Sequence, residues 1–250
     1  MLSLQNINVA IEGAPVLRNV SFSLKAGASA ALIGRNGAGK TTTVRTIMGF
    51  TEATGAMRLG GEDLGRVPPH RRPSLGIGYA PEDRRLFSAF TVEENILLPG
   101  RVAKIAPQES RRRLDRAYSV LPELKELAGR PAGSVSGGQG KMVALGRALM
   151  LGTRLVILDE PFQGLAPVLA QRYAEALRRL RLQDKEITLL ITESNPKLLD
   201  TFVDVTMSIE RGEIDKLAGW LSHVGEALMG SGQGPPAPTA FSPKDFDNQF

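Results

Sequence analysis

The sequence feature that most constrains the fold is a glycine-rich octapeptide that fits the pattern G-x-x-x-x-G-K-[ST]. It consists of Gly34, Arg35, Asn36, Gly37, Ala38, Gly39, Lys40 and Thr41. A short apolar run precedes it, and a helical stretch follows from about Lys40 to Met48. The glycines let successive backbone amides point inward at a phosphate, and the positive end of the helix adds to this attraction. The pattern therefore predicts a strand, a phosphate-binding loop and a helix, in that order.

The polar side chains of this loop suit a nucleoside triphosphate and its metal ion. Lys40 is placed to reach the β- and γ-phosphates, and the hydroxyl of Thr41 is placed to ligate Mg²⁺. Thr42 follows directly and belongs to the same predicted contact. We therefore expect the segment 34–42 to bind ATP together with Mg²⁺.

Two acidic residues, Asp159 and Glu160, follow an apolar stretch at 155–158. A carboxylate at the end of such a strand, beside the phosphate loop, can hold the Mg²⁺ shell, and Asp159 has that position. A second carboxylate one step further on can polarise an attacking water, which makes Glu160 the candidate general base. Alone, two acids at a strand end also fit a simple capped strand. Together with the phosphate loop, they predict a site that hydrolyses the nucleotide.

Strand and helix patterns alternate along most of the chain. The expected strands cover 2–9, 20–24, 29–33, 55–59, 77–80, 155–158, 187–191, 205–209 and 213–214. The expected helices cover 40–48 and 167–181, and a short one opens at Pro196. Such alternation predicts an α/β fold with a mainly parallel sheet.

The segment from about 86 to 140 departs from this alternation, because only helices are expected there. Thr91 and Glu94 match a capping box that starts the first of them, and breaks are expected at 99–100 and 128–135. We expect one domain over 1–229 that contains this helical insertion. The remainder, 230–250, is rich in Gly and Pro with little periodic apolar content, and is expected to be a disordered tail.

Composition excludes several classes of site and partner. The chain has 250 residues, a formal net charge of +5 and no cysteine, so disulfides and thiolate metal sites are excluded. Its short arginine clusters are not interleaved with aromatic residues, so we interpret them as solvated helix faces and expect no nucleic-acid partner. Its apolar runs are too short to span a bilayer. A role at a membrane would then be exercised from the cytoplasmic side through a partner.

A third motif carries a family resemblance. Val135-Ser136-Gly137-Gly138-Gln139 resembles the signature of ABC ATPases, and it stands some twenty residues before the acidic strand, as in that family. Exposed amides and a hydroxyl at the start of a helix form an anion site. The resemblance covers about 1–228. It implies a P-loop NTPase (RecA-like) core with an N-terminal antiparallel β subdomain and an inserted α-helical subdomain.

Further segments are similar to the ATPase subunits of branched-chain amino-acid importers and related urea and amide importers. They are Gly78-Tyr79-Ala80-Pro81-Glu82, Arg84-Arg85-Leu86-Phe87, Thr91-Val92-Glu93-Glu94-Asn95 and Gly164-Leu165-Ala166-Pro167. The resemblance implies ATP hydrolysis coupled to import, at the cytoplasmic face of the membrane. It implies a second ABC ATPase subunit, which is a sister chain or a second copy. The γ-phosphate of the ATP bound to that subunit would face this chain's signature. It also implies integral membrane permease subunits, contacted by the helical insertion and the loop near Glu82, and indirectly a solute-binding protein.

The chain departs from the general family pattern at four positions. Glu82 replaces a glutamine, and we expect its carboxylate oxygen still to contact Mg²⁺. Ile11 or its neighbours replace the aromatic residue that stacks on adenine, leaving apolar contact. Ser194 occupies the position of the switch histidine, and Ala166 replaces a common aspartate. The branched-chain subgroup also tends to lack this histidine and this aspartate. We therefore expect hydrolysis through Glu160 at a rate that the sequence does not fix.

Three alternatives stay open beside an importer ATPase. The chain could be a binding module whose ATP clamps a dimer while a partner's site performs most of the hydrolysis. It could be a non-transport ABC ATPase acting on DNA or the ribosome, although it has neither a second cassette nor a long coiled-coil insertion. It could be a P-loop kinase, which would not need the segment 135–139. The transported solute, the direction of transport and the choice between homodimer and heterodimer are not encoded in these motifs.

Overall fold

The computed structural model describes residues 1–199 and 201–218, and two β-sheets organise them. The larger sheet has six strands in the order β10-β9-β3-β8-β7-β6. Its strands are β3 (Ser29–Ile33), β6 (Ile77–Ala80), β7 (Leu155–Asp159), β8 (Thr188–Glu193), β9 (Val205–Glu210) and β10 (Glu213–Ala218). All neighbours pair in parallel except β9 and β10, which form an antiparallel hairpin.

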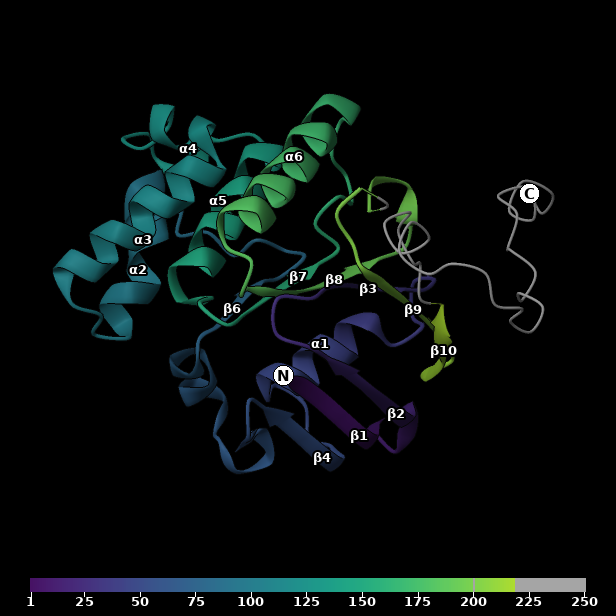
Figure 1. Cartoon of the computed structure of the whole chain (residues 1–250). Helices are drawn as coiled ribbons and strands as arrows, with labels where there is room; N and C mark the ends of the chain where they lie inside the picture. Colours follow the sequence, from purple (N-terminus) through teal and green to yellow (C-terminus); the bar gives the residue numbers. More distant parts are fainter. Residues whose placement is uncertain (200, 219–250) are drawn as a thin grey trace, which may run out of the picture. The chain divides into compact units, whose positions relative to one another are not determined.

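The smaller sheet is antiparallel and has the order β2-β1-β4-β5. Its strands are β1 (Leu2–Ile11), β2 (Ala14–Leu24), β4 (Thr54–Leu59) and β5 (Glu62–Asp63). Buried and exposed residues roughly alternate along β2, which is the pattern of a strand with one face on the core. Helix α1 (Lys40–Met48) lies between this sheet and the six-stranded sheet (Figure 1).

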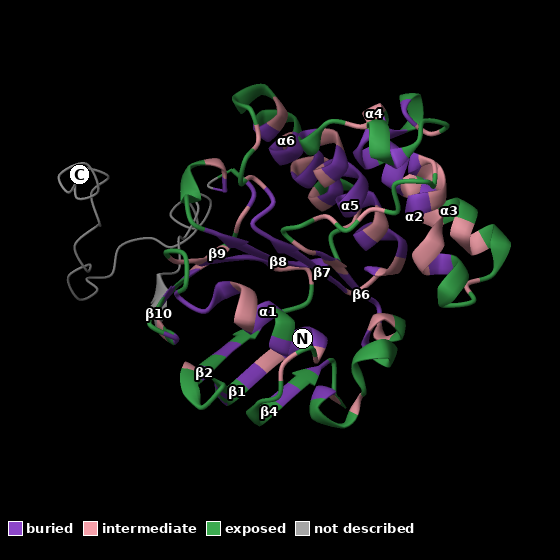
Figure 2. Cartoon of the chain, turned by 180° about the vertical axis from the view of Figure 1, so that it is seen from behind, coloured by how far each residue is buried: buried purple, intermediate pink, exposed green. Residues whose placement is uncertain are grey.

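The six-stranded sheet is buried on both faces, and successive residues of its central strands enter different cores. Leu155 and Ile157 pack with α1 and the antiparallel sheet, whereas Val156 and Leu158 pack against the large helices. Figure 2 shows this central burial, with exposed residues at the periphery. Continuous burial explains why the sequence of β7 is a run of apolar residues rather than an alternation.

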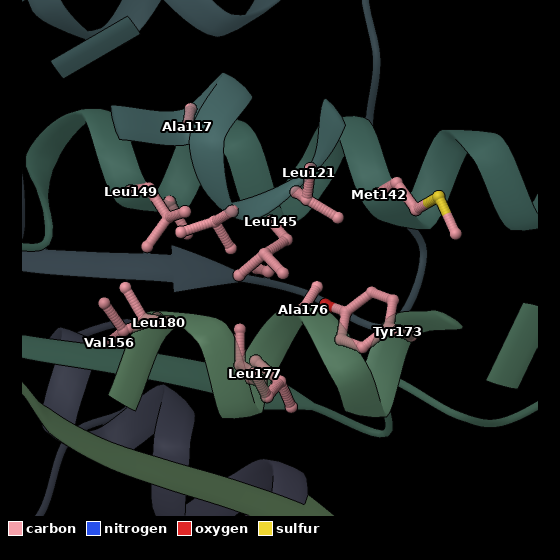
Figure 3. Packing of buried hydrophobic residues seen from close by; sticks show 14 of the residues in the cluster. Ala117, Leu121, Met142, Leu145, Leu149, Val156, Tyr173, Ala176, Leu177 and Leu180 are labelled. Atoms are coloured by element: carbon pink, nitrogen blue, oxygen red, sulfur yellow. The ribbon is translucent and has the colours of Figure 1, made fainter. Parts of the chain in front are cut away.

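Helices α5 (Gly137–Leu151) and α6 (Pro167–Gln183) cover the second face of the large sheet, and α2 (Val92–Val102), α3 (Pro107–Val120) and α4 (Pro122–Glu126) extend this helical layer (Figure 1). Figure 3 shows Leu145 and Leu149 of α5 between residues of α3 and α6, including Leu177. All three leucines are fully buried. At about 25 cal/mol per Å² of buried apolar area, such side chains supply most of the stabilisation of these helices. The described residues also form four 3₁₀ segments, at Leu64–Arg66, Pro69–Leu75, Ala132–Ser134 and Pro196–Leu198.

The predicted α/β architecture, with its mainly parallel sheet, antiparallel β subdomain and helical insertion, is confirmed. One predicted helix break is wrong, because α2 runs through Pro99 to Val102. The helix continues there because its buried face extends past the proline: Ile96 is fully buried, and the absence of a side chain at Gly100 lets α2 approach Met150 of α5. The predicted tail, 230–250, lies outside the described residues. In the part that the structure describes, no helix has the length and apolar character needed to cross a bilayer.

Candidate active site

The predicted phosphate loop connects β3 to α1, as its sequence requires. Gly37 and Gly39 have φ angles of +80° and +113°, which residues with a β-carbon rarely adopt. A β-carbon on Gly39 would also lie 2.8 Å from Leu17 Cδ2 of β2. Gly39 therefore permits both the curl of the loop and its close approach to the antiparallel sheet. The free amides at the N-terminus of α1 follow directly, so the loop and helix together form an anion-binding end.

Lys40, the first residue of α1, is almost completely buried at the centre of the site. Its Nζ donates to the main-chain oxygens of Gly34 and Arg35 at 2.6 and 3.1 Å. It also forms an ion pair with Glu160 Oε1 at 2.9 Å and a hydrogen bond with Ser194 Oγ at 3.1 Å. The ammonium group is thus folded back over the loop, within reach of the space that the loop amides surround.

Asp159, at the end of β7, is held by hydroxyl groups from three segments. Its Oδ1 accepts from Thr192 at 2.6 Å and from Thr41 at 3.2 Å, and its Oδ2 accepts from Tyr79 at 3.4 Å. Burial raises the pKa of Asp159, while the hydrogen bonds from Thr192 and Thr41 oppose this shift. The strand that carries Asp159 is not the neighbour of β3, since β8 lies between them. Thr41 nevertheless reaches Asp159 from α1, so the two residues predicted to contact Mg²⁺ lie side by side.

Glu160 lies in the turn after β7 and is also buried. Its φ is +48°, and its N–H donates to Thr192 O and Thr192 Oγ1, both at 3.1 Å. Ser194 Oγ bonds to Glu160 Oε1 at 2.9 Å and lies 3.1 Å from Asn36 Oδ1, so the predicted switch position contacts both the loop and the acid. Glu160 Oε2 is buried and has no hydrogen-bond partner among the residues that the structure describes. A buried acceptor without a partner is available to a water molecule or a substrate group.

Three residues of this site were not predicted from sequence. Thr192 joins the two acids, Glu193 Oε1 accepts from Phe162 N at 2.8 Å, and Lys141 Nζ donates to Glu160 O at 2.5 Å. Thr192 and Glu193 end an apolar strand with polar residues, as Asp159 does, and this was the available signal. The role of Lys141 has no comparable local signal, because it follows from the packing of α5 against the turn at Glu160.

Two predicted site residues are not brought to this cluster. Glu82 is exposed in the loop after β6, and no hydrogen bond or ion pair among the described residues joins it to Asp159 or Thr41. Ile11 ends β1 opposite Ala14 with 47% of its surface exposed. Its place at a hairpin end leaves it free for apolar contact, and its predicted contact with adenine stays a prediction.

The signature segment, 135–139, includes the N-terminal end of α5. The exposed Ser136 caps the helix: its Oγ accepts from Gln139 N at 3.3 Å, and Gln139 Oε1 accepts from Ser136 N at 2.9 Å. Val135 is half-buried, Gly137 is exposed and Gly138 packs against α6. Within the described chain, no hydrogen bond joins 135–139 to 34–42. The capped helix end therefore offers free amides to a group outside this phosphate loop.

The oxygen donors at Thr41 and Asp159 fit a hard divalent cation such as Mg²⁺. They already converge at 3.2 Å, and the buried carboxylate has few other ways to balance its charge. Across the described residues there is no cluster of three or more His, Asp or Glu that would form an all-protein metal site. The arrangement instead suits an ion bound with one or two protein ligands, nucleotide phosphates and water.

Comparison with known proteins decides the family. The ABC transporter family matches residues 17–163, more than half of the chain, and the match includes the phosphate loop, the signature and the acidic pair. The chain belongs to the ABC transporter ATP-binding family. The cassettes of this family are ATPases, so this ABC protein is an ATPase and the resemblance seen in its motifs is confirmed.

Relatives of this ABC cassette serve different transport systems. It is 35% identical to the high-affinity branched-chain amino acid transport ATP-binding protein BraG of Pseudomonas aeruginosa, over 86% of this chain and 91% of the relative. It is 29% identical to the lipopolysaccharide export system ATP-binding protein LptB of Haemophilus influenzae, over 78% and 80% of the two chains. A solved ABC transporter cassette in its ADP conformation superposes with a TM-score of 0.74 at 30% identity, covering 88% of this chain and 91% of the other.

Proposed function

We propose that this chain is the ATP-hydrolysing subunit of an ABC importer for branched-chain amino acids or related small amides. It would work at the cytoplasmic face of the membrane, as a dimer with a sister chain or a second copy. Closure of this dimer would drive separate permease subunits that receive solute from a solute-binding protein. The similarity to BraG along nearly the whole length of both chains is the observation that favours import of amino acids.

The proposed hydrolysis rests on the buried cluster around Lys40, Asp159 and Glu160. The loop 34–42 binds the triphosphate of ATP through its amides, and Lys40 neutralises phosphate charge after leaving Glu160. Thr41 and Asp159, joined by Glu82 in the ATP-bound state, would hold Mg²⁺, which would supply charge stabilisation on the phosphate oxygens when bound. Ile11 provides an apolar surface for the adenine.

Glu160 is the residue that we assign to activation of the attacking water. Its carboxylate is ion-paired with Lys40 on one oxygen, and the other oxygen has no hydrogen-bond partner within the described part of the chain. When Lys40 turns to phosphate, the oxygen of Glu160 that was paired with it is freed, and the carboxylate can accept a proton from the attacking water. Ser194 occupies the position where most of the family has a histidine. Its hydroxyl donates to Oε1 and holds the Glu160 carboxylate in place.

The second subunit completes the site through its own signature residues. Each chain's segment 135–139, with the Ser136 hydroxyl and the first amides of α5, would close on the γ-phosphate held by the neighbouring loop. A runner-up function is a weakly hydrolysing ATP-binding partner subunit, and the serine at position 194 favours it. The similarity to LptB makes export the alternative direction of transport.

An ATPase assay with Glu160→Gln separates hydrolysis from binding alone. The variant keeps the shape of the side chain but removes its basicity, so kcat should fall by at least about 100-fold while ATP still binds. Glu186→Gln, which changes an exposed carboxylate outside the site, is the matched control and should keep wild-type kcat. Equal, slow turnover of wild type and Glu160→Gln, with intact ATP binding in both, would reject hydrolysis by this subunit.

A transport experiment tests the proposed solute. The chain should co-purify with permease subunits from its own cell, and the purified complex in vesicles should take up leucine, isoleucine or a small amide when ATP is supplied on the side of the cassette. Extraction of lipid from the vesicles without solute uptake would support the export alternative instead.

A further inference from the structure

Lys141 links the helix that begins at the signature to the turn that carries Glu160. It lies in the second turn of α5 and is half-buried. Its Nζ donates to the main-chain oxygen of Glu160 at 2.5 Å. This bond joins the helical layer directly to the peptide of the proposed catalytic residue, whereas the side chain of Glu160 contacts Lys40 and Ser194.

The peptide geometry at Glu160 depends on such contacts. A φ of +48° is unfavourable for a residue with a β-carbon and persists only where the surroundings hold it. Thr192 holds the N–H of Glu160 from the core sheet. Lys141 holds its carbonyl oxygen from the opposite side, on an element of the helical layer. A small shift of α5 relative to the sheet would therefore change the direction in which the Glu160 side chain points.

The charges around Lys141 keep its ammonium group at this junction. Burial lowers the pKa of Lys141, and the carboxylates of Glu193, Glu82 and Glu160 oppose this shift, while Arg84 adds to it. The three acids come from the end of β8, the loop after β6 and the turn after β7. The charges that act on this lysine of the signature helix thus come from three core segments. Among them is Glu82, an acid where most of the family has a neutral glutamine.

Arg147, further along the same helix, shows what a purely structural cation on α5 looks like. It is half-buried and donates from Nη1 to the main-chain oxygen of Arg85 at 2.7 Å. Its guanidinium lies over the ring of Phe87, 5.6 Å from the ring centre. Both side chains tie α5 to a backbone carbonyl, but only Lys141 is tied to the turn of Glu160.

We propose that Lys141 is a positioning residue for ATP hydrolysis, which transmits movement of the signature helix to the peptide of Glu160. When the start of α5 contacts the nucleotide of a neighbouring subunit, α5 moves against the sheet and Lys141 carries this movement to Glu160. Occupancy of the neighbour's site thereby sets the direction of this chain's own carboxylate. The inference deepens the proposed function, because it rests on the assignment of Glu160 as the base.

Steady-state ATPase kinetics of the full chain test this role. Lys141→Met keeps the length and helix propensity of the side chain but removes the donor, so kcat should fall about tenfold. KM and the Kd for a fluorescent ATP analogue should stay within about twofold, and the melting temperature should stay close to that of wild type. Lys141→Arg restores a charged donor and should recover more than about half of kcat. Arg147→Met, the matched control, should keep kcat within about twofold.

Several results would overturn the proposal. A Lys141→Met protein with wild-type kcat, equal losses in Lys141→Met and Arg147→Met, or a parallel change in KM and melting temperature would each assign Lys141 a structural role. No recovery in Lys141→Arg would exclude the donated hydrogen bond. If Lys141→Met does not fold, Lys141→Gln is judged by the same criteria. A wild type no faster than Glu160→Gln rejects the proposed function as well, whereas a slow Glu160→Gln beside a fast Lys141→Met rejects only the role of Lys141.

Discussion

Glu193 joins two loops of the site through one buried residue. Its main-chain oxygen accepts from Gly34 N at 3.2 Å, and its carboxylate accepts from Phe162 N at 2.8 Å. The start of the phosphate loop and the segment after Glu160 are therefore tied to the same point of β8. Burial raises the pKa of Glu193 to about 7, the N–H of Phe162 opposes this shift, and the neighbouring Glu160 carboxylate adds to it.

Stability should consequently depend on pH through Glu193. The folded pKa lies above the ordinary value of 4.5, so the folded protein retains a proton that the unfolded chain loses first. The contribution of this group is complete below pH 4.5 and is lost as pH rises through 7. Between pH 5 and 8, the free energy of unfolding of wild type should fall by at least about 1 kcal/mol relative to Glu193→Gln. Urea denaturation at each pH measures it.

The control for this measurement is Glu186→Gln, which removes an exposed carboxylate shortly before β8 begins. It should show the same pH dependence as wild type. Parallel curves for wild type and Glu193→Gln would show that Glu193 titrates equally in the folded and unfolded chains.

The residues that sequence motifs predicted are those whose chemistry is local. The phosphate loop needs its glycines and Lys40 within eight positions, and Asp159 and Glu160 follow directly from one strand. Thr192 and Lys141 escaped prediction because their partners are distant in sequence and become neighbours only through the sheet order and the packing of α5. The contact of Glu82 with a metal ion stays a prediction for the ATP-bound state.

At the scale of elements, the contact between β6 and α5 depends on a glycine. Gly78 in the middle of β6 faces the C-terminal end of α5, and a β-carbon there would lie 2.0 Å from the main-chain oxygen of Ala148. Gly78→Ala should therefore force the helix and strand apart and destabilise the protein by about 3 kcal/mol. Gly129→Ala, at an exposed position where a β-carbon meets nothing within 4 Å, should change stability by less than about 0.5 kcal/mol. Thermal or urea unfolding compares them, and similar stabilities for the two variants would contradict the close packing.

Element prediction succeeded where burial and periodicity agree. The apolar runs of β3, β7 and β8 predict strands, and all three strands are present. The antiparallel β1 and β2 extend beyond their predicted bounds, because their pairing continues to the hairpin at 12–13. Helix propensity predicts a break at Pro99, because proline is unfavourable inside a helix. The helix α2 nevertheless continues through Pro99, because its packing on α5 stabilises it there.

At the scale of the whole molecule, the described chain carries its phosphate loop and its signature segment on different elements. The phosphate loop, Asp159 and Glu160 gather at the carboxyl ends of the parallel strands, while the capped start of α5 is bonded to none of the loop residues. In the proposed function, a single chain therefore holds the triphosphate from one side only, and its signature segment is available to a second subunit. This separation is why closure of a dimer and hydrolysis are coupled in the proposed function.

Ser136→Arg tests this assembly without altering the phosphate loop. The arginine side chain adds bulk at an exposed helix start and removes the cap, which costs about 1 kcal/mol of helix stability. Ser136→Ala removes the same cap but adds no bulk, so it is the control.

The measurement is ATP-dependent dimerisation, followed by light scattering in a Glu160→Gln background, which slows hydrolysis. Dimerisation should weaken at least about tenfold with Ser136→Arg, and much less with Ser136→Ala. Binding of a fluorescent ATP analogue should stay within about twofold in both, because the loop at 34–42 is untouched. ATP-dependent dimers of normal strength in Ser136→Arg would show that the signature segment does not contact the neighbour's nucleotide, since an arginine cannot fit between a helix start and a phosphate that a serine contacts directly.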